Sequence, residues 1–597
     1  MVEPPSGENF LDVASSLSGK RWRARASDAR IGMALAQRLE LPEILGRVLT
    51  ARGVSLEEAD AFLEPTLRKL LPNPSHLKDM DVAAARLADA IRNGEAVAVF
   101  GDYDVDGATS SALLERFFRS LGASLRVYIP DRRKEGYGPT AAALQKLRNE
   151  GASLVVTVDC GATAFSALEA ASAAGLDVIV VDHHIGEPRL PPALAVVNPN
   201  RLDETSPHRQ LAAVGVTYLL VIAVNRCLRK AGFYATRNEP DLLQWLDLVA
   251  LGTVCDVASL TGVNRAFVVQ GLQFAAKRGN PGIAALADVA KVEMRPTAYH
   301  LGFALGPRVN AGGRVGEASL GARLLATEDV VEARELAAHL DVLNMERRQI
   351  EADVQEQAIA QIETAGEIGH IAFAAGADWH PGVVGIVASR LKERYGRPAF
   401  VAAIEDGRVS GSGRSVPGVD LGSAVLAARQ AGLIEKGGGH AMAAGFTASV
   451  DALPELRAFL DARLGEALTR IGFVPSLGFD GVLTPAAATP EFVALLERLS
   501  PFGAGNAEPR FAFADARIVF SDIVGADHVR CTITDAQGNG RVKGISFRSA
   551  DTPLGQALLD RGGLALHLAG HLRVDRWQGR ESVQLFIEDV APARPAG

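Results

Sequence analysis

The chain has 597 residues, of which 48% are hydrophobic and 22% charged, and its formal net charge is −8. This length exceeds what one hydrophobic core usually serves, so the sequence predicts three or four domains. The net charge does not indicate a nucleic-acid binder, although a whole-chain count misses local basic patches and counts metal-binding carboxylates against the total. The four cysteines are far apart and form no CxxC pair, which argues against a disulfide framework or a zinc ribbon and indicates a reducing cytoplasm.

The N-terminal region shows no sign of export or membrane anchoring. It lacks the basic-then-apolar pattern of a signal peptide. We expect residues 1–45 to form a loosely ordered N-terminal extension with a small basic cluster at 19–25. The most apolar stretch, residues 211–224, is shorter than the ~18 residues that a bilayer span needs, so it predicts a buried helix. The protein is therefore expected to be cytoplasmic and to make no membrane contact.

The segment 46–329 has the pattern of an α/β domain. Continuous Val- and Ile-rich runs alternate with segments of helical spacing, which is typical of a parallel sheet covered on both faces. The runs that predict strands are residues 96–104, 125–130, 153–161 and 177–184, and those that predict helices are 108–122 and 166–175.

Three further regions follow along the chain. Residues 330–365 are charged and contain no Gly or Pro, which predicts a long connecting helix. A second α/β domain is expected over 366–470. Residues 471–597 contain short runs in which apolar and polar residues alternate, and these suggest a small antiparallel β-barrel.

Acidic residues gather where the predicted strands end. Asp102, Asp104 and Asp106 stand at alternate positions where the first predicted strand ends, and Asp159 stands near the end of another. The predicted strand 177–184 ends in Asp182, His183 and His184, and a helical segment supplies Asp256. Ligands of open α/β sheets collect beyond the carboxyl ends of the strands, so these side chains are expected to meet at one edge. An Asp-rich, His-poor set suits Mn²⁺ or Mg²⁺ better than zinc.

A single Asp after a strand is usually a turn or helix-capping residue. That explanation fails for the whole set, because several strands deliver acidic or imidazole side chains to one edge. We therefore interpret the set as a site for two or more divalent cations. Two metal ions ~3.5–4 Å apart can activate a water and neutralise phosphoryl oxygens during in-line hydrolysis.

The motifs DYDVDG (102–107), VDCG (158–161) and VDHH (181–184), together with Asp256, resemble those of the DHH phosphoesterases. Within that superfamily, residues 45–592 are similar to the RecJ family of bacterial 5′→3′ exonucleases specific for single-stranded DNA. The similarity extends over LGPRVNAGGR (305–314), WHPGVVGIVASRL (379–391), GSGRS (411–415), GGGHAMAAG (437–445) and SPFGAGNAEPRF (500–511).

The resemblance implies a DHH domain, a DHH-associated (DHHA1) domain and an OB-fold, in that order. It implies roles for individual residues. The implied metal ligands are Asp104, Asp106, Asp159, His183 and Asp256, with Asp159 bridging two ions. Other catalytic residues would be Asp102 and Asp182 as accessory acids, His184 facing the scissile phosphate, and Arg308 and Asn310 contacting the DNA backbone. The DNA 5′ end and its phosphate would be held by Arg132, Tyr137, Ser412 and Arg414.

The family also implies a monomer that acts in recombination and repair, with a single-strand-binding protein and a RecQ-type helicase as partners. Three alternatives compete with this interpretation. Small DHH phosphoesterases that cleave pyrophosphate or short nucleotides usually lack the C-terminal barrel and the PFGAGN segment found here. A catalytically inactive replication scaffold would have lost ligand residues, and all are present. A Rossmann dinucleotide enzyme is rejected because DYDVDG lacks GxGxxG and places acid where a pyrophosphate would bind.

Overall fold

The structure is a computed structural model that describes residues 9–132, 134–366, 368–560, 565–577 and 580–593. The chain divides into two compact units. We name them the terminal unit (Met1–Pro72, Val257–Gln270 and Val474–Gly597) and the central unit (Asn73–Asp256 and Gly271–Phe473). This division is coarser than the predicted domains, whose boundaries stay a prediction.

The first part of the central unit contains a fully parallel sheet of five strands, as the sequence predicts. Valine, leucine and isoleucine fill the central strands, which are buried on both faces. The strands, in spatial order, are β3 (Leu125–Tyr128), β2 (Val97–Gly101), β4 (Leu154–Val158), β5 (Asp177–Val181) and β6 (Ala195–Val197).

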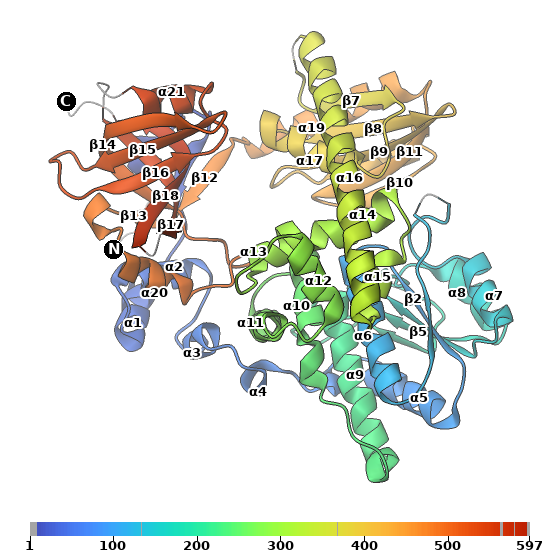
Figure 1. The fold of residues 1–597 in the computed structure, drawn as a ribbon. Helices are drawn as coiled ribbons and strands as arrows, with labels where there is room; N and C mark the ends of the chain where they lie inside the picture. The colour runs from blue at the N-terminus through green and yellow to red at the C-terminus, as the bar shows by residue number, and fades with distance from the viewer. Residues whose placement is uncertain (1–8, 133, 367, 561–564, 578–579, 594–597) are drawn as a thin grey trace. The chain divides into compact units, whose positions relative to one another are not determined.

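Helices cover both faces of this sheet (Figure 1). Phe100 and Val155 pack with Leu144 and Leu168 of α7 (Ala141–Asn149) and α8 (Phe165–Ala173) on one face. On the other side lie α5 (Met80–Asn93), α6 (Val105–Ser120) and α9 (Ala213–Lys230). The predicted buried helix at 211–224 is thus confirmed as part of α9. Further helical elements of this part include α10 (Leu246–Cys255), α12 (Pro281–Val289), α13 (Ala298–His300), a π-helical turn (Leu301–Leu305), α14 (Gly306–Val315) and α15 (Leu320–Ala326). Helix α11 (Gly262–Ala276) is divided between the two units after Gln270.

A helix of 35 residues, α16 (Val330–Thr364), joins the two parts of the central unit and confirms the predicted connecting helix. It is drawn as the long helix that runs between them in Figure 1. Beyond it lies a five-stranded sheet with α17 (Val384–Tyr395), α18 (Leu421–Gln430) and α19 (Leu453–Ile471). The strands are, in spatial order, β10 (Lys436–His440), β11 (Ala443–Ser449), β9 (Arg408–Arg414), β8 (Ala399–Glu405) and β7 (Ala372–Ala377).

The terminal unit contains a closed barrel. Its strands are β14 (Phe511–Val524), β15 (His528–Thr534), β16 (Val542–Ser546), β18 (Arg580–Pro592) and β17 (Leu566–Trp577), and β14 pairs with β17 to close the ring. The prediction of a purely antiparallel barrel is wrong at β16–β18, which is parallel, as is the short β13 (Gly481–Val482) beside β14. Local alternation reveals strands but not the direction of their partners, which explains the error.

The expectation of a loosely ordered N-terminus is wrong for the described residues from 21 onward. Strand β1 (Arg21–Ala24) pairs in parallel with β12 (Ser476–Phe479). Trp22 is fully buried, and its Nε1 donates to Asp589 Oδ2 at 2.8 Å, 567 residues later in the chain. Residues 1–8 of the predicted extension lie outside the described residues. The unit's other helices are α1 (Ala29–Leu39), α2 (Glu43–Ala51), α3 (Ala59–Leu63), α4 (Leu67–Leu70), α20 (Pro490–Glu497) and α21 (Pro553–Leu559).

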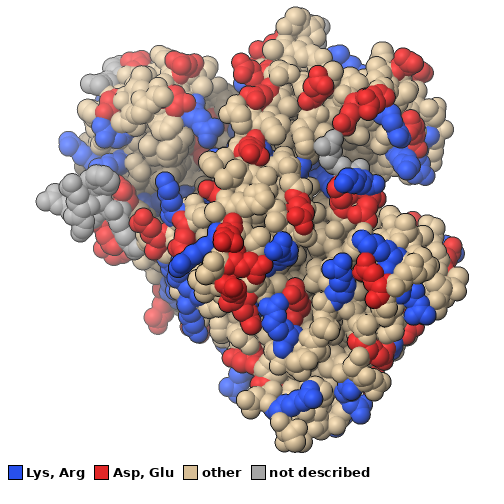
Figure 2. Space-filling model, turned by 45° about the vertical axis from the view of Figure 1, so that its right-hand side comes forward, with Lys and Arg blue, Asp and Glu red and all other residues tan. Residues whose placement is uncertain are grey.

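The described helices include none that is both long enough and apolar enough to cross a membrane. Figure 2 shows acidic and basic side chains interspersed over the face in view, with no single large basic area. A binding site for a polyanion therefore has to be sought among particular side chains and cavities rather than in the overall charge.

Candidate active site

Three neighbouring strands of the parallel sheet end in register and deliver acids to one edge. Gly101 of β2 pairs with Val158 of β4, and Val158 pairs with Val181 of β5. The residues that follow these strand ends are Asp102, Asp159 and the run Asp182, His183, His184. The predicted convergence at the carboxyl edge of the sheet is what the structure shows.

Two more acids come from the start of α6. Asp104 caps this helix, since its Oδ1 accepts hydrogen bonds from the main-chain N–H groups of Asp106 and Gly107 at 2.9 and 3.0 Å. Asp106 is buried, and its carboxylate accepts from the N–H groups of Ala213 and Val214, at the start of α9. Gly107 is required here, because a Cβ at this position would collide with the main chain of Asp102. Asp104 thus has the ordinary role of a helix cap, and its metal role stays a prediction.

The carboxylates and imidazoles meet closely around His183. Its Nε2 lies 3.3 Å from Asp159 Oδ1 and 3.9 Å from Asp106 Oδ2, and its Nδ1 lies 3.7 Å from Asp256 Oδ2. Asp256 reaches this point from the C-terminal end of α10. Candidate ligand atoms lie within 4.8 Å of one another in three groups: Asp159–His183–His184, Asp106–His183–Asp256 and Asp102–Asp104–Asp159.

The unsatisfied polar atoms of this cluster fit a divalent cation. Asp102 Oδ1, Asp159 Oδ1 and His183 Nε2 are buried and have no hydrogen-bond partner among the described residues. Leaving buried polar atoms unpaired is costly, so three together indicate a missing ligand. Carboxylate oxygens with one imidazole suit Mn²⁺ or Mg²⁺. The residues present therefore form a site for divalent metal.

The electrostatics of the cluster lead to the same conclusion. Burial, followed by the charge of Asp104, raises the pKa of Asp106 to about 7. Burial and the charges of Asp106 and Asp104 raise the pKa of Asp256 to about 9. The pKa values of Asp102 and Asp159 are likewise raised by burial and by neighbouring carboxylates. These acids resist ionisation unless positive charge enters the cluster.

Asp182 behaves differently from its neighbours. Burial disfavours its charge, but hydrogen bonding from His184 and from main-chain N–H groups lowers its pKa to about 2. Its Oδ1 lies 2.8 Å from His184 Nδ1 and accepts from the N–H groups of His183 and His184, and its Oδ2 accepts from the N–H of Ala162. The pKa of His184 is raised, because its bond to Asp182 outweighs its burial. An ionised carboxylate can only accept, so His184 Nδ1 carries the proton.

Tyr137 contacts residues at the carboxyl edge of the sheet, and its predicted role at the DNA 5′ end stays a prediction. Its Oη donates to the main-chain carbonyl of Asp159 at 3.1 Å and lies 3.2 Å from His184 Nδ1. His440, at the end of β10, stacks near His184 with ring centroids 6.5 Å apart. Residues from both parts of the central unit therefore surround His184.

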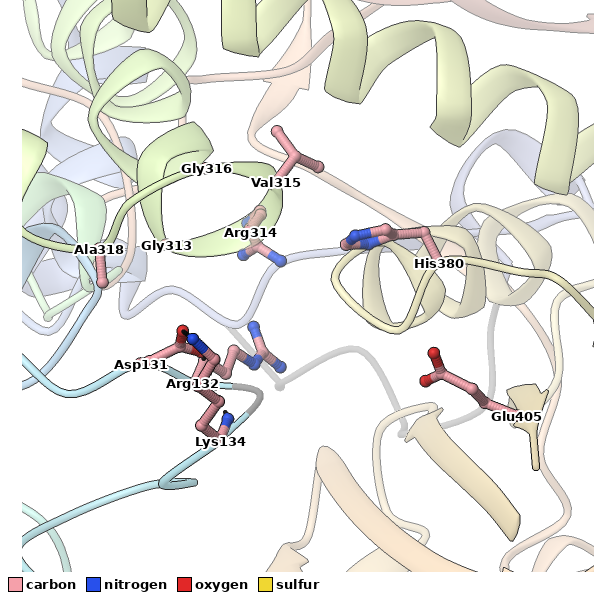
Figure 3. A pocket seen from close by; sticks show the side chains of 10 residues that line it. All are labelled: Asp131, Arg132, Lys134, Gly313, Arg314, Val315, Gly316, Ala318, His380 and Glu405. Atoms are coloured by element: carbon pink, nitrogen blue, oxygen red, sulfur yellow. Dashed lines mark hydrogen bonds and ion pairs between the residues drawn. The ribbon is translucent and has the colours of Figure 1, made fainter. Parts of the chain in front are cut away.

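A cavity of about 480 Å³ lies within the central unit. It is lined by the charged or titratable side chains of Asp131, Arg132, Lys134, Arg314, His380 and Glu405. Figure 3 shows the guanidinium groups of Arg132 and Arg314 pointing toward each other across it. Burial and the nearby charge of Arg132 lower the pKa of Arg314 to about 10.

Ser412 and Arg414 project from β9 close to this cavity. An Arg414 Nη1 group donates to Ser412 Oγ at 2.9 Å and to the carbonyl of Gly413 at 2.8 Å. A Cβ at Gly385, in the first turn of α17, would lie 2.9 Å from Arg414 and 3.0 Å from Ser412. Burial and the charge of Arg132 lower the pKa of Arg414. Arg132, Arg314 and Arg414 have no ion-pair partner among the described residues, and we call them the arginine cluster.

The segment 306–314 is helical in the structure. It belongs to α14, in which Arg308 pairs with Asp341 Oδ1 at 2.8 Å and donates to the carbonyl of Ala304 at 2.6 Å. Asn310 lies half-buried on the same helix. Contact of Arg308 and Asn310 with the DNA backbone stays a prediction.

Arg314 lines the cavity, and the sequence-based predictions did not include it among the site residues. It follows Arg308 by six residues, which places the two on different faces of a helix at about 100° per residue. Its Nη1 donates to the carbonyl of Gly382 at 3.0 Å. A sequence-based prediction that this segment is helical would have placed Arg308 and Arg314 on different faces and so given them different surroundings.

Three family models match the chain in sequence order. They are the DHH family N-terminal domain at residues 96–253, the DHHA1 domain at 368–466 and the RecJ OB domain at 479–589. The predicted fold, a DHH domain with a parallel sheet, a DHHA1 domain and a barrel, is confirmed.

Known proteins are similar over nearly the whole chain. The single-stranded-DNA-specific exonuclease RecJ of Escherichia coli (strain K12) is 38% identical over 571 residues, which are 93% of this chain and 96% of that protein. Crystal structures of RecJ from Thermus thermophilus in complex with Mn²⁺ and with Mg²⁺ match as well. The Mn²⁺ complex has a TM-score of 0.79 and 30% identity, and covers 96% of this chain and 80% of its own. A crystal structure of exonuclease RecJ bound to manganese has a TM-score of 0.56 and 34% identity, and covers 66% of this chain and 97% of its own.

Proposed function

Because the chain belongs to the RecJ family of single-stranded-DNA-specific exonucleases, we propose that it removes nucleotides from the 5′ end of single-stranded DNA by metal-dependent hydrolysis. The observation that carries the proposal is the pairing, in one unit, of an Asp/His cluster with a cluster of arginines that lack ion-pair partners among the described residues. The first suits hydrolysis of a phosphodiester, and the second suits recognition of a phosphate.

We infer that two divalent cations, Mn²⁺ or Mg²⁺, are held by Asp104, Asp106, Asp159, His183 and Asp256. The number two is supported by the ligand groups, since Asp106–His183–Asp256 and Asp102–Asp104–Asp159 share no residue. Bound divalent cations supply positive charge for the phosphoryl oxygens and lower the pKa of a bound water.

The chain's own residues orient this chemistry. Asp182 fixes the imidazole of His184 through Nδ1, which leaves Nε2 without a protein partner among the described residues. With its raised pKa, His184 offers a charged N–H to an oxygen of the scissile phosphate. Tyr137 also limits the movement of this ring, since its Oη lies 3.2 Å from His184 Nδ1 and its own ring packs against the imidazole edge to face. Asp102 adds a buried carboxylate to the cluster as an accessory acid.

Polarity requires recognition of a feature that only one end of the strand has. A terminal 5′-phosphate carries more negative charge than an internal diester, and arginine forks match phosphate oxygens. The arginine cluster provides three guanidinium groups, and Ser412 adds a hydroxyl. Together they form a receptor for the terminal phosphate beside the metal cluster, so that the bond nearest the 5′ end is presented for hydrolysis.

The alternatives are less well supported. An inactive scaffold would not retain all the acids and imidazoles of the cluster, and a small phosphoesterase would not carry the RecJ OB domain. The proposed association with a single-strand-binding protein and a RecQ-type helicase, and the monomeric state, stay predictions.

Substitution of Arg414 tests end recognition directly. Arg414→Ala is expected to raise the KM for 5′-phosphorylated strands by about 10- to 100-fold, as for loss of a hydrogen bond to a charged group of about 1.5–3 kcal/mol. The KM for 5′-hydroxyl strands should change far less. Both substrates are compared at several salt concentrations, because general phosphate contacts depend on salt.

Arg308→Ala is the matched control, since it removes an arginine from the same unit. A contact with internal phosphates predicts an equal effect of this change on the two substrates. An equal loss on both substrates with Arg414→Ala would contradict the assignment of the arginine cluster to the 5′ end.

A further inference from the structure

The guanidinium group of Arg132 rests on an aromatic ring. Its Cζ lies 5.2 Å from the ring centroid of Tyr103, within the distance at which cations and aromatic faces attract each other. Among the described residues, Arg132 has no hydrogen bond or ion pair. The ring of Tyr103 is therefore the contact that the structure gives to this side chain.

The other two members of the arginine cluster are held by hydrogen bonds. Arg314 donates to the carbonyl of Gly382, and Arg414 donates to Ser412 Oγ and to the carbonyl of Gly413. After burial, the charge of Arg132 is the next cause that lowers the pKa of both. The three guanidinium groups repel one another, so contacts with the protein are needed to hold them close together when no anion is bound.

Tyr103 is itself held firmly. It stands between Asp102 and Asp104 in the turn that carries the metal-binding acids. Helix α14, which carries Arg314, packs on its main chain, because a Cβ at Gly313 would lie 2.7 Å from the carbonyl oxygen of Tyr103. Burial raises the pKa of its hydroxyl to about 12, so the ring stays neutral at physiological pH.

We propose that Tyr103 is a positioning residue for recognition of the 5′ end: its ring holds the guanidinium of Arg132 toward the other two arginines and ties the arginine cluster to the metal-binding turn. This inference rests on the proposed function. A preformed receptor loses less conformational entropy when phosphate binds, so the ring contributes to affinity for the end group and not to the chemical step.

The test is a double-mutant cycle with Tyr103→Leu and Arg132→Ala. Tyr103→Leu is expected to raise the KM for 5′-phosphorylated strands about 2- to 5-fold, which is the cation–π range for an exposed cation such as Arg132 converted at 1.4 kcal/mol per factor of ten. The KM for 5′-hydroxyl strands and kcat should change little, and Tyr103→Phe should behave like the wild type. The double variant should be no worse than Arg132→Ala alone.

Because Tyr103→Leu could also disturb the metal-binding turn, a second series of variants changes the electrostatics of the ring while keeping its shape nearly constant. Phenylalanine analogues with increasing ring fluorination at position 103 keep the ring but weaken its negative face. The KM for 5′-phosphorylated strands should rise along the series, while the Mn²⁺ affinity measured by calorimetry stays constant.

Three results would overturn the inference: a flat fluorination series, equal effects of Tyr103→Leu on the two substrates, or additive losses in the double variant. Failure of the proposed function would give different results. The wild-type protein would then have the same KM for 5′-phosphorylated and 5′-hydroxyl strands, and neither Arg132→Ala nor Arg414→Ala would raise the KM for one substrate more than for the other.

Discussion

Asp182 Oδ1 lies 2.8 Å from His184 Nδ1, and the same carboxylate accepts three main-chain N–H groups. Asp182 thus fixes both the ring of His184 and the turn on which it stands. Its low pKa shows that the ionised form is the one the surroundings favour. Asp182 therefore affects the site indirectly, by orienting the imidazole of His184.

Asp182→Asn is therefore expected to lower kcat about 10- to 100-fold, the usual loss when a partner that orients a metal-site residue is removed. Its effect on Mn²⁺ affinity, measured by calorimetry, should be smaller. Asp203→Asn is the matched control, because Asp203 also has a pKa of about 2 but pairs with Arg201 and Lys78, outside the Asp/His cluster. A kcat within about twofold of the wild type for Asp182→Asn, well short of that usual loss, would show that His184 needs no such support.

Removal of divalent cations should make the protein less stable as the pH rises. In the folded protein the pKa of Asp106 is about 7 and that of Asp256 about 9, against an ordinary value of about 3.9. Between the pKa of about 3.9 in the unfolded state and the raised pKa values in the folded state, the folded state binds more protons than the unfolded state. The free energy of unfolding therefore falls as the pH rises through this range. The stability these groups contribute is present below about pH 4 and is lost as the pH rises through about 7 and then about 9.

Thermal unfolding in a chelator, from about pH 5 to about pH 9, checks this expectation. The melting temperature should fall with pH in the chelator and recover with Mn²⁺, because bound metal replaces the protons. Asp256→Asn should raise the melting temperature in the chelator near pH 9 and reduce the gain with Mn²⁺, whereas the exposed Asp89→Asn should do neither. Melting temperatures that rise with pH in the chelator would contradict the claim that burial and neighbouring carboxylates raise the pKa values of Asp106 and Asp256.

The two compact units predict which fragments can fold. A fragment that ends at 473 but keeps the N-terminus would expose Trp22, whose partner Asp589 is lost. A fragment of residues 73–473 contains the whole central unit, together with the segment Val257–Gln270 of the terminal unit, and all the predicted ligand residues.

We expect the 73–473 fragment to bind Mn²⁺ and cleave short single-stranded oligonucleotides, with weaker binding of long strands because the barrel is absent. It should also melt at a lower temperature, since Arg265 loses the carbonyls of Phe62 and Ser500 to which it donates. The 1–473 fragment should aggregate. A soluble 73–473 fragment that binds Mn²⁺ but cleaves no oligonucleotide at high concentration would show that catalysis needs the terminal unit.

Much of the central unit could be predicted because its signals are local. Continuous apolar strands that end in Asp102, Asp159 and Asp182 define both the sheet and its functional edge. The 35-residue helix α16 follows from a long charged stretch that contains no Gly or Pro.

The parts that escaped prediction depend on distant partners or on side-chain direction. The pairing of β1 with β12 joins segments from opposite ends of the chain, and local periodicity contains no trace of it. The contrast between Arg308, which pairs with Asp341, and Arg314, which points into the cavity, depends on the helical state of α14. A glycine-rich sequence does not predict that state, because glycine is a poor helix former.

The central claim is hydrolysis from the 5′ end that depends on divalent metal. It is tested most directly by digesting end-labelled single-stranded DNA that carries a block at either the 5′ or the 3′ end, with and without Mn²⁺. The account predicts that the 3′-blocked strand is degraded to nucleotides in Mn²⁺, that the 5′-blocked strand survives, and that neither is cut in a chelator or by Asp159→Ala. Degradation of the 5′-blocked strand at the same rate, or cleavage by Asp159→Ala in Mn²⁺, would contradict it.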